Sequence, residues 1–344
     1  MESYPLIEER VSLRQYCTLR VGGSARYFAR AARAAHIPFL ARAARERRTP
    51  VYVLGGGSNI LCTDATIEKF FIKMEESGIR RVHETSEALS VEVAAGTRWD
   101  DFVVWAVAHR TSGTEALSAI PGTVGAAPIQ NIGAYGQEVG NVIVSVHAYD
   151  TVHDTFVDIP AEKCGFGYRT SLFKTRARGR FIITSVLFTL TKHAPEVPEY
   201  PDVQRYFAER SLPNPSAAEI RNAVADIRAK KLPDPAVIPN AGSFFKNPLV
   251  PHRAFKVLQR AFPHLPSFAL PDGTRKIPAG WLIEQCGFKG KWVGNAGVYE
   301  KNALILIGNG RTTCRELMAL RDAIVLAVRR RFSIALEMEP EVVE

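Results

Sequence analysis

The chain has 344 residues, of which 46% are hydrophobic and 23% are charged, with 44 Lys and Arg against 35 Asp and Glu. This composition is typical of a folded protein with a large core and excludes a disordered chain. No apolar run reaches the ~20 residues of a membrane span, and at ~150 residues per domain the length predicts about two domains.

The formal net charge of +9 raises the question of nucleic-acid binding. Arginines are concentrated in the first fifty residues and at 329–331, but stacking aromatic residues are not interleaved with them. This pattern favours a solvated basic face or attraction for small anionic substrates. Five scattered cysteines without a Cys-x-x-Cys pair argue against a disulfide framework and a zinc site, and they favour reduced thiols in the cytoplasm.

In chain order, residues 25–54 predict a strand, a helix and a strand, and extended segments follow near 67–73, 79–84 and 89–96. Apolar spacing predicts a helix over 99–110, and β-branched runs predict strands over 142–150 and 180–190. The Pro-rich stretch 193–203 has the composition of a linker.

Beyond the linker, the pairs Ser216/Glu219 and Thr313/Glu316 have the spacing of capping boxes, and each precedes a helical pattern. Residues 334–343 predict a closing strand. Strand-rich patterning before a break near 195–215, and helix-rich patterning after it, predict an α+β protein of two units.

Two glycine-rich stretches are candidates for chemistry. Gly55-Gly56-Gly57-Ser58-Asn59 follows an apolar strand and is either a tight turn or a phosphate cradle. It matches neither a Walker A loop nor a Rossmann fingerprint. The stretch 120–136 contains further glycines with Gln130 and Asn131, and is either a buried connection or a surface for a flat ligand. The two stretches together favour a two-part nucleotide cofactor.

Three single residues have both an ordinary and a chemical interpretation. Arg169, next to Tyr168 in a glycine-flanked turn, is either a surface residue or a clamp for a substrate carboxylate. Ser243 follows a glycine without a hydrolase elbow around it, and is either a turn serine or a proton donor. Glu341 lies in the closing strand, where a solvated carboxylate is the default.

These motifs, taken together, resemble those of the UDP-N-acetylenolpyruvoylglucosamine reductase family. The matching segments occur in family order over nearly the whole chain: TLRVGGSARYF (18–28), VLGGGSNIL (53–61), IPGTVGAAPIQNIGAYG (120–136), GFGYRTSLFK (165–174), KLPDP (231–235), NAGSFFKNP (240–248), AGWLIEQCGFKG (279–290) and LEMEPEV (336–342).

The resemblance implies an FAD-binding domain of the vanillyl-alcohol-oxidase (PCMH) type, made of two α+β subdomains, and an α+β substrate-binding domain. The expected boundaries are 1–75 and 76–212 for the two FAD-binding subdomains and 213–332 for the substrate domain. Residues 333–344 are the closing strand, which carries a catalytic Glu. The segment around Tyr200 implies the longer subclass, in which a Tyr-bearing loop covers the site.

The implied reaction is an oxidoreduction of peptidoglycan precursor synthesis. NADPH reduces a noncovalent FAD, and hydride then passes to C3 of the enolpyruvyl group of the UDP-sugar, which gives UDP-N-acetylmuramate. By the resemblance, Arg169 stabilises the enolate and Glu341 donates a hydrogen bond as a neutral acid, because a second carboxylate would repel the substrate. Ser243 delivers the proton to C2.

The resemblance also assigns binding residues. Substrate contacts are expected from Tyr168, Tyr200, Lys231 and Asn247. FAD contacts are expected from Gly55, Gly56, Gly57, Ser58, Asn59, Ile120, Pro121, Gly122, Thr123, Gly125, Ala126, Gln130, Asn131, Gly133 and Tyr135. The expected partner is the small nucleotide-sugar substrate, with no metal, nucleic acid or membrane, and the protein is expected to be a cytoplasmic monomer.

The sequence departs from the family pattern at two places, which affect details of the site and not the class of protein. The chain ends three residues after Glu341, and Ala126-Ala127 replaces the paired serines of some members.

Two other functions are weighed against the reductase: a nucleic-acid or acidic-partner binding module, which depends on the charge alone, and a flavin oxidase of the related superfamily. The absence of a flavin-tethering His or Cys in GGGSN argues against the oxidase.

Overall fold

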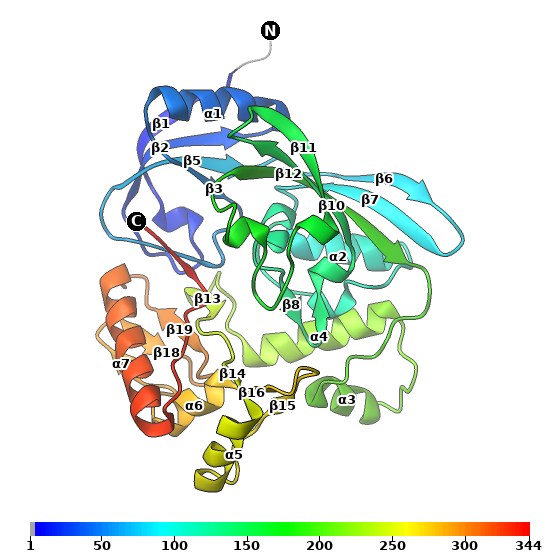
Figure 1. Ribbon diagram of the computed structural model, residues 1–344, viewed down its shortest axis with the longest axis vertical. Helices are drawn as coiled ribbons and strands as arrows, with labels where there is room; N and C mark the ends of the chain where they lie inside the picture. The colour runs from blue at the N-terminus through cyan, green and yellow to red at the C-terminus, as the bar shows by residue number, and fades with distance from the viewer. Residues whose placement is uncertain (1–3) are drawn as a thin grey trace. The chain divides into compact units, whose positions relative to one another are not determined.

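The computed structural model describes residues 4–344, and these form two compact units (Figure 1). Each unit is discontinuous in sequence. The first contains the residues up to Val11, Ala25–Gly57 and Glu68–Lys230, and the second contains Ser12–Ser24, Ser58–Ile67 and Lys231–Glu344. Both expected glycine-rich stretches therefore contribute mainly to the first unit.

The first unit begins with a four-stranded sheet in the order β1-β2-β5-β3. Strands β3 and β5 are parallel, with Leu54 opposite Lys73. Helix α1 lies along this sheet in Figure 1 and buries Ile37 and Leu40 in the same core as Phe70. The bounds are β1 Ile7–Ser12, β2 Ser24–Ala31, α1 Ile37–Glu46, β3 Val51–Leu54 and β5 Ile67–Met74.

A five-stranded antiparallel sheet, in the order β11-β10-β12-β7-β6, completes this core. Helix α2 packs on it through Phe102, whose ring centroid lies 4.7 Å from that of Phe188 on β12. The bounds are β6 Ile79–Glu84, β7 Ala88–Ala94, α2 Trp99–Ala108, β10 Ile143–Asp150, β11 Thr155–Pro160 and β12 Phe181–Thr191, with the short pair β8 Gly133–Ala134 and β9 Gln137–Glu138.

Two further helices, α3 (Pro201–Ala208) and α4 (Ala217–Lys231), end the first unit. They share a small core that includes Val203, Phe207 and Val224. The predicted capping box starts α4, because the Ser216 amide donates to Glu219 and the Glu219 amide donates to the Ser216 hydroxyl. This packing places 213–230 with the first unit, whereas the expected boundary falls after residue 212.

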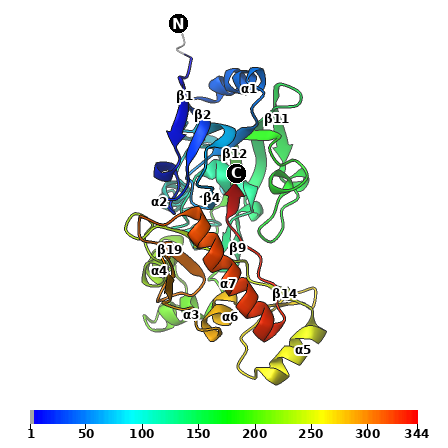
Figure 2. The same ribbon diagram turned by 90° about the vertical axis from the view of Figure 1, so that its left-hand side faces the viewer.

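The second unit combines short sheets with three helices (Figure 2). One sheet has the order β13-β19-β18-β17, another has the order β14-β16-β15, and β20 pairs in parallel with β4. Helix α7 packs against β18 and α6 and begins with the predicted capping box of Thr313 and Glu316. The bounds are β4 Ile60–Cys62, β13 Asn240–Ser243, β14 Leu249–Val250, α5 His252–Ala261, β15 Phe268–Ala269, β16 Arg275–Lys276, α6 Ala279–Gln285, β17 Trp292–Val293, β18 Ala296–Val298, β19 Ile305–Gly308, α7 Cys314–Phe332 and β20 Glu341–Val343.

Two local expectations need correction. The closing strand is restricted to Glu341–Val343, although residues 334–343 were expected to be extended as one strand. The stretch expected to be a linker ends inside α3, whose first residue is Pro201. A proline at the first helical position fits a helix start, because its fixed φ suits the helix and its missing N–H has no partner there in any case.

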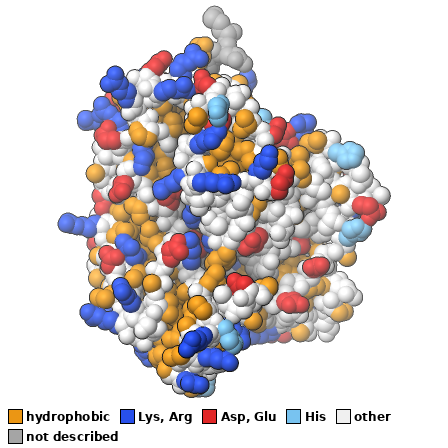
Figure 3. Space-filling view, viewed as in Figure 1, with side chains coloured by type: hydrophobic (Ala, Val, Ile, Leu, Met, Phe, Trp, Pro, Cys, Tyr) orange, Lys and Arg blue, Asp and Glu red, His pale blue; other side chains and the backbone are white. Residues whose placement is uncertain are grey.

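Many of the basic side chains lie next to acidic ones. On the face shown in Figure 3, Lys and Arg side chains are interspersed with Asp and Glu. Several arginines form ion pairs, such as Arg45 with Asp154 at 2.8 Å and Arg30 with Glu75 at 2.6 Å. This distribution fits a solvated, mixed-charge surface. Within residues 4–344, the helices are all too short or too polar to cross a bilayer.

Candidate active site

The two glycine-rich stretches meet in the first unit. A methyl group added to Gly56 would lie 2.7 Å from the Gly122 Cα, and one added to Gly55 would lie 2.6 Å from the Thr123 hydroxyl oxygen. Gly57 has a φ of 64°, which glycine adopts without strain. The two backbones therefore approach more closely than a side chain at Gly56 would allow, and glycine-rich backbone of this kind suits the pyrophosphate of a dinucleotide. These residues fit FAD.

Lys73 adds a positive charge at this loop that sequence analysis did not single out. It lies on β5 opposite Leu54, and its ammonium group donates a hydrogen bond to the Gly55 carbonyl. Burial lowers the pKa of Lys73, and Glu75 partly offsets that effect. The sequence offered one signal for Lys73: it lies in the apolar run of β5, and a lysine on a largely buried strand needs a partner for its charge.

Asn131 connects the second glycine-rich stretch to the turn that carries Arg169. Its side chain is 1% exposed and donates to Glu138 at 2.7 Å and to the Gly167 carbonyl at 3.2 Å, while its carbonyl oxygen accepts from the Gly140 amide at 2.9 Å. The nearby Gln130 accepts from Lys174 at 3.2 Å. The side-chain amide of Asn131 thus holds residues 138–140 and the turn at Gly167 next to the second glycine-rich stretch.

Arg169 is held by its own turn. It has a φ of 54°, and its guanidinium donates to the Gly133 carbonyl at 2.7 Å and lies 5.6 Å from the centre of the Tyr168 ring. Gly167 and Thr170 exchange two backbone hydrogen bonds of 3.1 Å across the turn. The turn and the hydrogen bond to Gly133 therefore fix the position of the guanidinium group.

A group of aromatic and cationic side chains surrounds Arg169 in the first unit. The Tyr135 and Tyr200 rings lie 5.3 Å apart, edge to face. Burial raises the pKa of Tyr200, and the nearby Arg169 opposes that shift. Burial lowers the pKa of Arg228; Tyr135 and Asp100 oppose that shift, and the charge of Arg169 adds to it. Two arginines whose charges interact in this unit favour an anionic ligand.

Arg228 was not predicted as a site residue. It projects from α4, and its Nε atom is buried with no hydrogen-bond partner within residues 4–344. The signal available in the sequence was its spacing of seven residues from Arg221, which places both on one helix face. Arg221 pairs with Asp100 at 3.0 Å, so this face of α4 carries two partly buried cations.

The second unit brings Ser243 and Glu341 into one backbone framework. Ser243 ends β13 opposite Ile305, and Glu341 begins β20 opposite Ile60. The segments next to them pair, because the Glu339 amide donates to the Phe244 carbonyl at 3.0 Å and Phe245 forms a bridge with Met338. Arg169 belongs to the first unit, so the three expected catalytic residues come from both units.

Other expected ligand residues also lie in the second unit. The Glu341 amide donates to the Asn59 carbonyl at 3.0 Å, so the end of the GGGSN loop supports the closing strand. The Asn247 side-chain oxygen accepts from the Ala279 amide at 2.9 Å at the start of α6, which orients its NH₂ group. Lys231 is the last residue of α4 and the first residue of the KLPDP segment.

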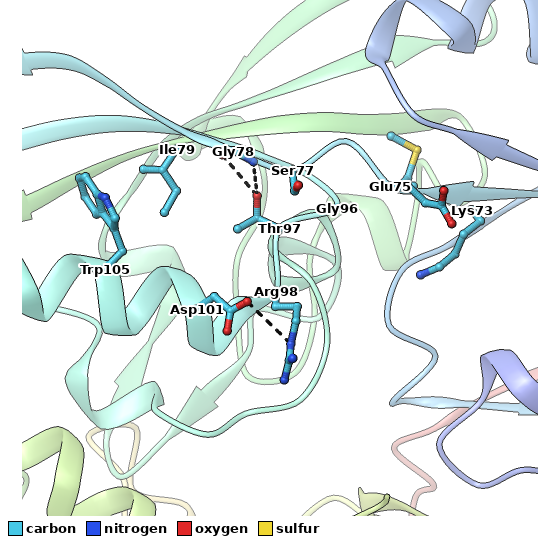
Figure 4. Close-up of a pocket in the computed structure, with 11 residues that line it drawn as sticks. Lys73, Glu75, Ser77, Gly78, Ile79, Gly96, Thr97, Arg98, Asp101 and Trp105 are labelled. Atoms are coloured by element: carbon cyan, nitrogen blue, oxygen red, sulfur yellow. Dashed lines mark hydrogen bonds and ion pairs between the residues drawn. The ribbon is translucent and has the colours of Figure 1, made fainter. Parts of the chain in front are cut away.

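A separate cavity of about 620 Å³ opens in the first unit between α2 and the β5–β6 connection (Figure 4). Trp105 and Ile79 lie toward one end and Lys73 and Glu75 toward the other, and the Thr97 hydroxyl group hydrogen-bonds Gly78. None of its lining residues is among the predicted site residues. Lys73 connects it to the glycine loop.

Comparison with protein families defines the class of protein first. Residues 25–155 match the family model of an FAD binding domain, and this range contains GGGSN and the stretch 120–136. The protein is therefore a flavoprotein with FAD as its cofactor, and the expected α+β class with an FAD-binding domain is confirmed. Residues 234–343 match the model of the UDP-N-acetylenolpyruvoylglucosamine reductase C-terminal domain.

Whole-chain relatives then identify the family. The UDP-N-acetylenolpyruvoylglucosamine reductase of Bordetella pertussis is 43% identical over 98% of this chain and 96% of its own length. The reductase of Dechloromonas aromatica is 45% identical over 84% of this chain and 86% of its own. The crystal structure of the Thermus caldophilus reductase has a TM-score of 0.68 at 24% identity and covers 99% of this chain and all of that one. The chain belongs to the UDP-N-acetylenolpyruvoylglucosamine reductase family of oxidoreductases.

Proposed function

We propose that the protein catalyses the NADPH-dependent reduction of UDP-N-acetylglucosamine enolpyruvate to UDP-N-acetylmuramate. Family membership over 98% of the chain is the observation that carries this proposal. The proposed reaction consumes one NADPH, one proton and one enolpyruvyl nucleotide, and it yields NADP⁺ and the saturated lactyl ether. When bound, FAD accepts hydride from NADPH and supplies it to C3 of the substrate double bond.

Arg169 is proposed to stabilise the enolate that develops at the substrate carboxylate. Its turn and its hydrogen bond to Gly133 hold the guanidinium in place before reaction, and such preorganised charge is usually a large catalytic contribution. Arg228 of α4, whose charge interacts with that of Arg169, adds to the positive potential. Tyr168 and Tyr200 are proposed to contact the substrate beside these cations.

Ser243 is proposed to deliver the proton to C2, and Glu341 to hydrogen-bond the substrate carboxylate as a neutral acid. The backbone pairing between their segments supports a fixed spacing of the two groups. A serine hydroxyl group is a weak acid, so it needs the strongly basic carbon of the enolate as its acceptor. Lys231 and Asn247 are proposed to bind the diphosphate, Lys231 as a point charge.

An anaerobic absorbance experiment on Ser243→Ala tests this proposal. NADPH should bleach the flavin of the variant at the normal rate, while reoxidation by the enolpyruvyl nucleotide should slow by about 10²-fold or more, because the proton donor is lost. Ser86→Ala, in the exposed turn between β6 and β7, is the matched control and should behave as the unmodified protein.

Because flavin reduction and flavin reoxidation are followed separately, the experiment distinguishes a wrong role for Ser243 from a wrong reductase assignment. Normal reoxidation of Ser243→Ala would exclude Ser243 as proton donor and leave the reductase assignment intact. If only oxygen reoxidised the unmodified protein after bleaching, an oxidase would replace the reductase. Failure of FAD to bind at all would contradict both.

A further inference from the structure

Two thiols lie against each other in the second unit. The Cys17 and Cys62 sulfur atoms are 3.5 Å apart, although the residues are 45 positions apart in sequence. Cys17 follows a short 3-10 helix and is 4% exposed, whereas Cys62 is the last residue of β4 and is fully buried. The sequence spacing of the five cysteines predicted scattered thiols, so only the fold brings these two together.

The backbone around Cys62 is held on both sides. A methyl group on Gly22 would lie 2.5 Å from the Cys62 Cβ, which shows how closely the Gly22 backbone packs against it. The Gly23 amide donates to the Thr63 carbonyl at 2.8 Å, and the Thr63 amide donates to Val343 of β20 at 3.0 Å. The two sulfur atoms are therefore kept adjacent by packing.

We propose that Cys17 and Cys62 form a dithiol oxidation site that a hydroperoxide converts to a disulfide. The Cys17 sulfur, at the edge of the buried region, attacks the peroxide; an S–O bond forms, the O–O bond breaks, and water (or an alcohol) leaves. The Cys62 sulfur then displaces the hydroxyl group of the resulting sulfenic acid as a second water. The thiols lose two electrons and two protons, and the peroxide is reduced.

Burial disfavours the thiolate form of the other buried thiols. Burial raises the pKa of Cys314 to about 11, and Asp64 and Cys62 add to the effect. Burial also raises the pKa of Cys164 to about 11. Because the thiolate is the nucleophile, both groups stay protonated and unreactive near neutral pH. Cys286 is half-buried in the second unit, and burial raises its pKa as well.

The location of the pair links its oxidation state to β20. Cys62 lies opposite Val343 in the parallel pair, and the Glu341 amide donates to the carbonyl of Asn59, which immediately precedes β4. A disulfide ties β4 to the segment before Thr18 and so restricts local opening of the β4–β20 pair. The thiol chemistry itself does not depend on the catalytic role proposed for Glu341.

Peptide mapping tests the site on the full-length, FAD-loaded protein. The reduced protein is treated with equimolar hydrogen peroxide, quenched with N-ethylmaleimide and digested with trypsin without reductant. Peptides 15–20 and 49–69 should appear joined, two hydrogens lighter than their sum, and dithiothreitol should separate them. Cys17→Ser should abolish the joined species, whereas the matched variant Cys164→Ser should retain it.

Two other results decide against the proposal. If Cys286 takes up the peroxide while Cys17 and Cys62 are both alkylated after unfolding, the pair is not the oxidation site. Since serine at a buried position can impair folding, Cys17→Ala, verified by its melting temperature, provides a second loss-of-link variant. Amide hydrogen exchange of residues 337–344 should slow on oxidation and recover with dithiothreitol, and unchanged exchange would overturn the link to β20.

Discussion

Asn240 holds the stretch before Ser243 in shape through three side-chain hydrogen bonds. It is 2% exposed; its NH₂ group donates to the carbonyls of Pro233 at 3.0 Å and Ile238 at 2.8 Å, and its side-chain oxygen accepts from the Gly242 amide at 2.9 Å. Gly242, with a φ of 69°, immediately precedes Ser243. Asn240 therefore acts as a positioning residue for the proposed proton donor.

Asn240→Ala should lower the free energy of unfolding by about 2–3 kcal/mol, because two buried carbonyls and one N–H lose their partners. Denaturant titration measures this loss. Asn222→Ala, at an exposed position on α4, is the control and should change stability by less than about 0.5 kcal/mol. Equal effects of the two substitutions would refute the role of Asn240.

Asp150 shows how a buried carboxylate makes stability depend on pH. Its side chain is 3% exposed and accepts from Arg180 at 2.6 Å and 3.0 Å, from His153 at 2.7 Å and from the Val152 amide at 3.0 Å. The hydrogen bond from Arg180 is the main cause that lowers the pKa of Asp150 below its ordinary 3.8. The charged form is thus favoured in the folded state.

For Asp150→Asn we expect a loss of about 2–3 kcal/mol at pH 7, since the charged hydrogen bonds are weakened. A lowered pKa contributes stability that is present above the ordinary value of 3.8 and is lost as the pH falls through the folded-state value. The difference from the unmodified protein should therefore shrink below about pH 4. Asp158→Asn, 73% exposed and paired with His147, is the control. A difference that stays constant from pH 7 to pH 3 would contradict this account.

At the scale of elements, the glycine loop after β3 is the clearest connection between sequence and site. Gly56→Ala should reduce FAD occupancy about tenfold or more, because the new methyl group meets the Gly122 backbone, which cannot move as a flexible side chain can. The ratio of flavin to protein absorbance measures the loss. Gly280→Ala on α6, whose methyl group would lie 3.6 Å from its nearest neighbours, is the control. Normal flavin content in Gly56→Ala would show that the two stretches need not touch.

The elements that were predicted are those with local signals. Both capping boxes begin helices where the spacing of Ser216/Glu219 and Thr313/Glu316 indicated. The strand at 180–190 coincides with a run of β-branched and aromatic residues, and the strand at 25–31 contains the aromatic pair Tyr27 and Phe28. Helix α3 was not predicted, because prolines around 193–203 read as a linker whereas Pro201 is at a helix start. The closing strand is short because its pairing with β4 covers only Glu341–Val343.

At the scale of the whole molecule, the two units have separate hydrophobic cores. One contains Phe70, Phe102 and Phe188, and the other contains Phe244, Leu317 and Ile324. Separate cores predict two unfolding transitions in calorimetry, and the glycine stretches that fit FAD belong mainly to the first unit.

FAD at about 100 times its Kd should therefore stabilise the first unit by about 2.7 kcal/mol and raise the melting temperature of that transition more than the other. Differential scanning calorimetry with and without added FAD measures both shifts. The Gly56→Ala variant should lose the shift. A single transition, or an equal shift of both, would show that the units unfold together.

Sequence alone determined the family, the α+β class and the two glycine stretches, because these depend on short motifs whose residues are neighbours in the chain. The roles assigned to Arg169, Ser243, Glu341 and the ligand residues came from family resemblance and stay predictions. The same holds for the domain boundaries and the monomeric state.

Tertiary structure alone decided what distant segments bring together: the parallel pairing of β20 with β4, the contact of Cys17 with Cys62, and the burial of Lys73 and Arg228 near the site. The physical reason is the same in each case. Pairing, burial and pKa depend on neighbours that are remote in the chain, and no local pattern of residues encodes which remote segment packs against them.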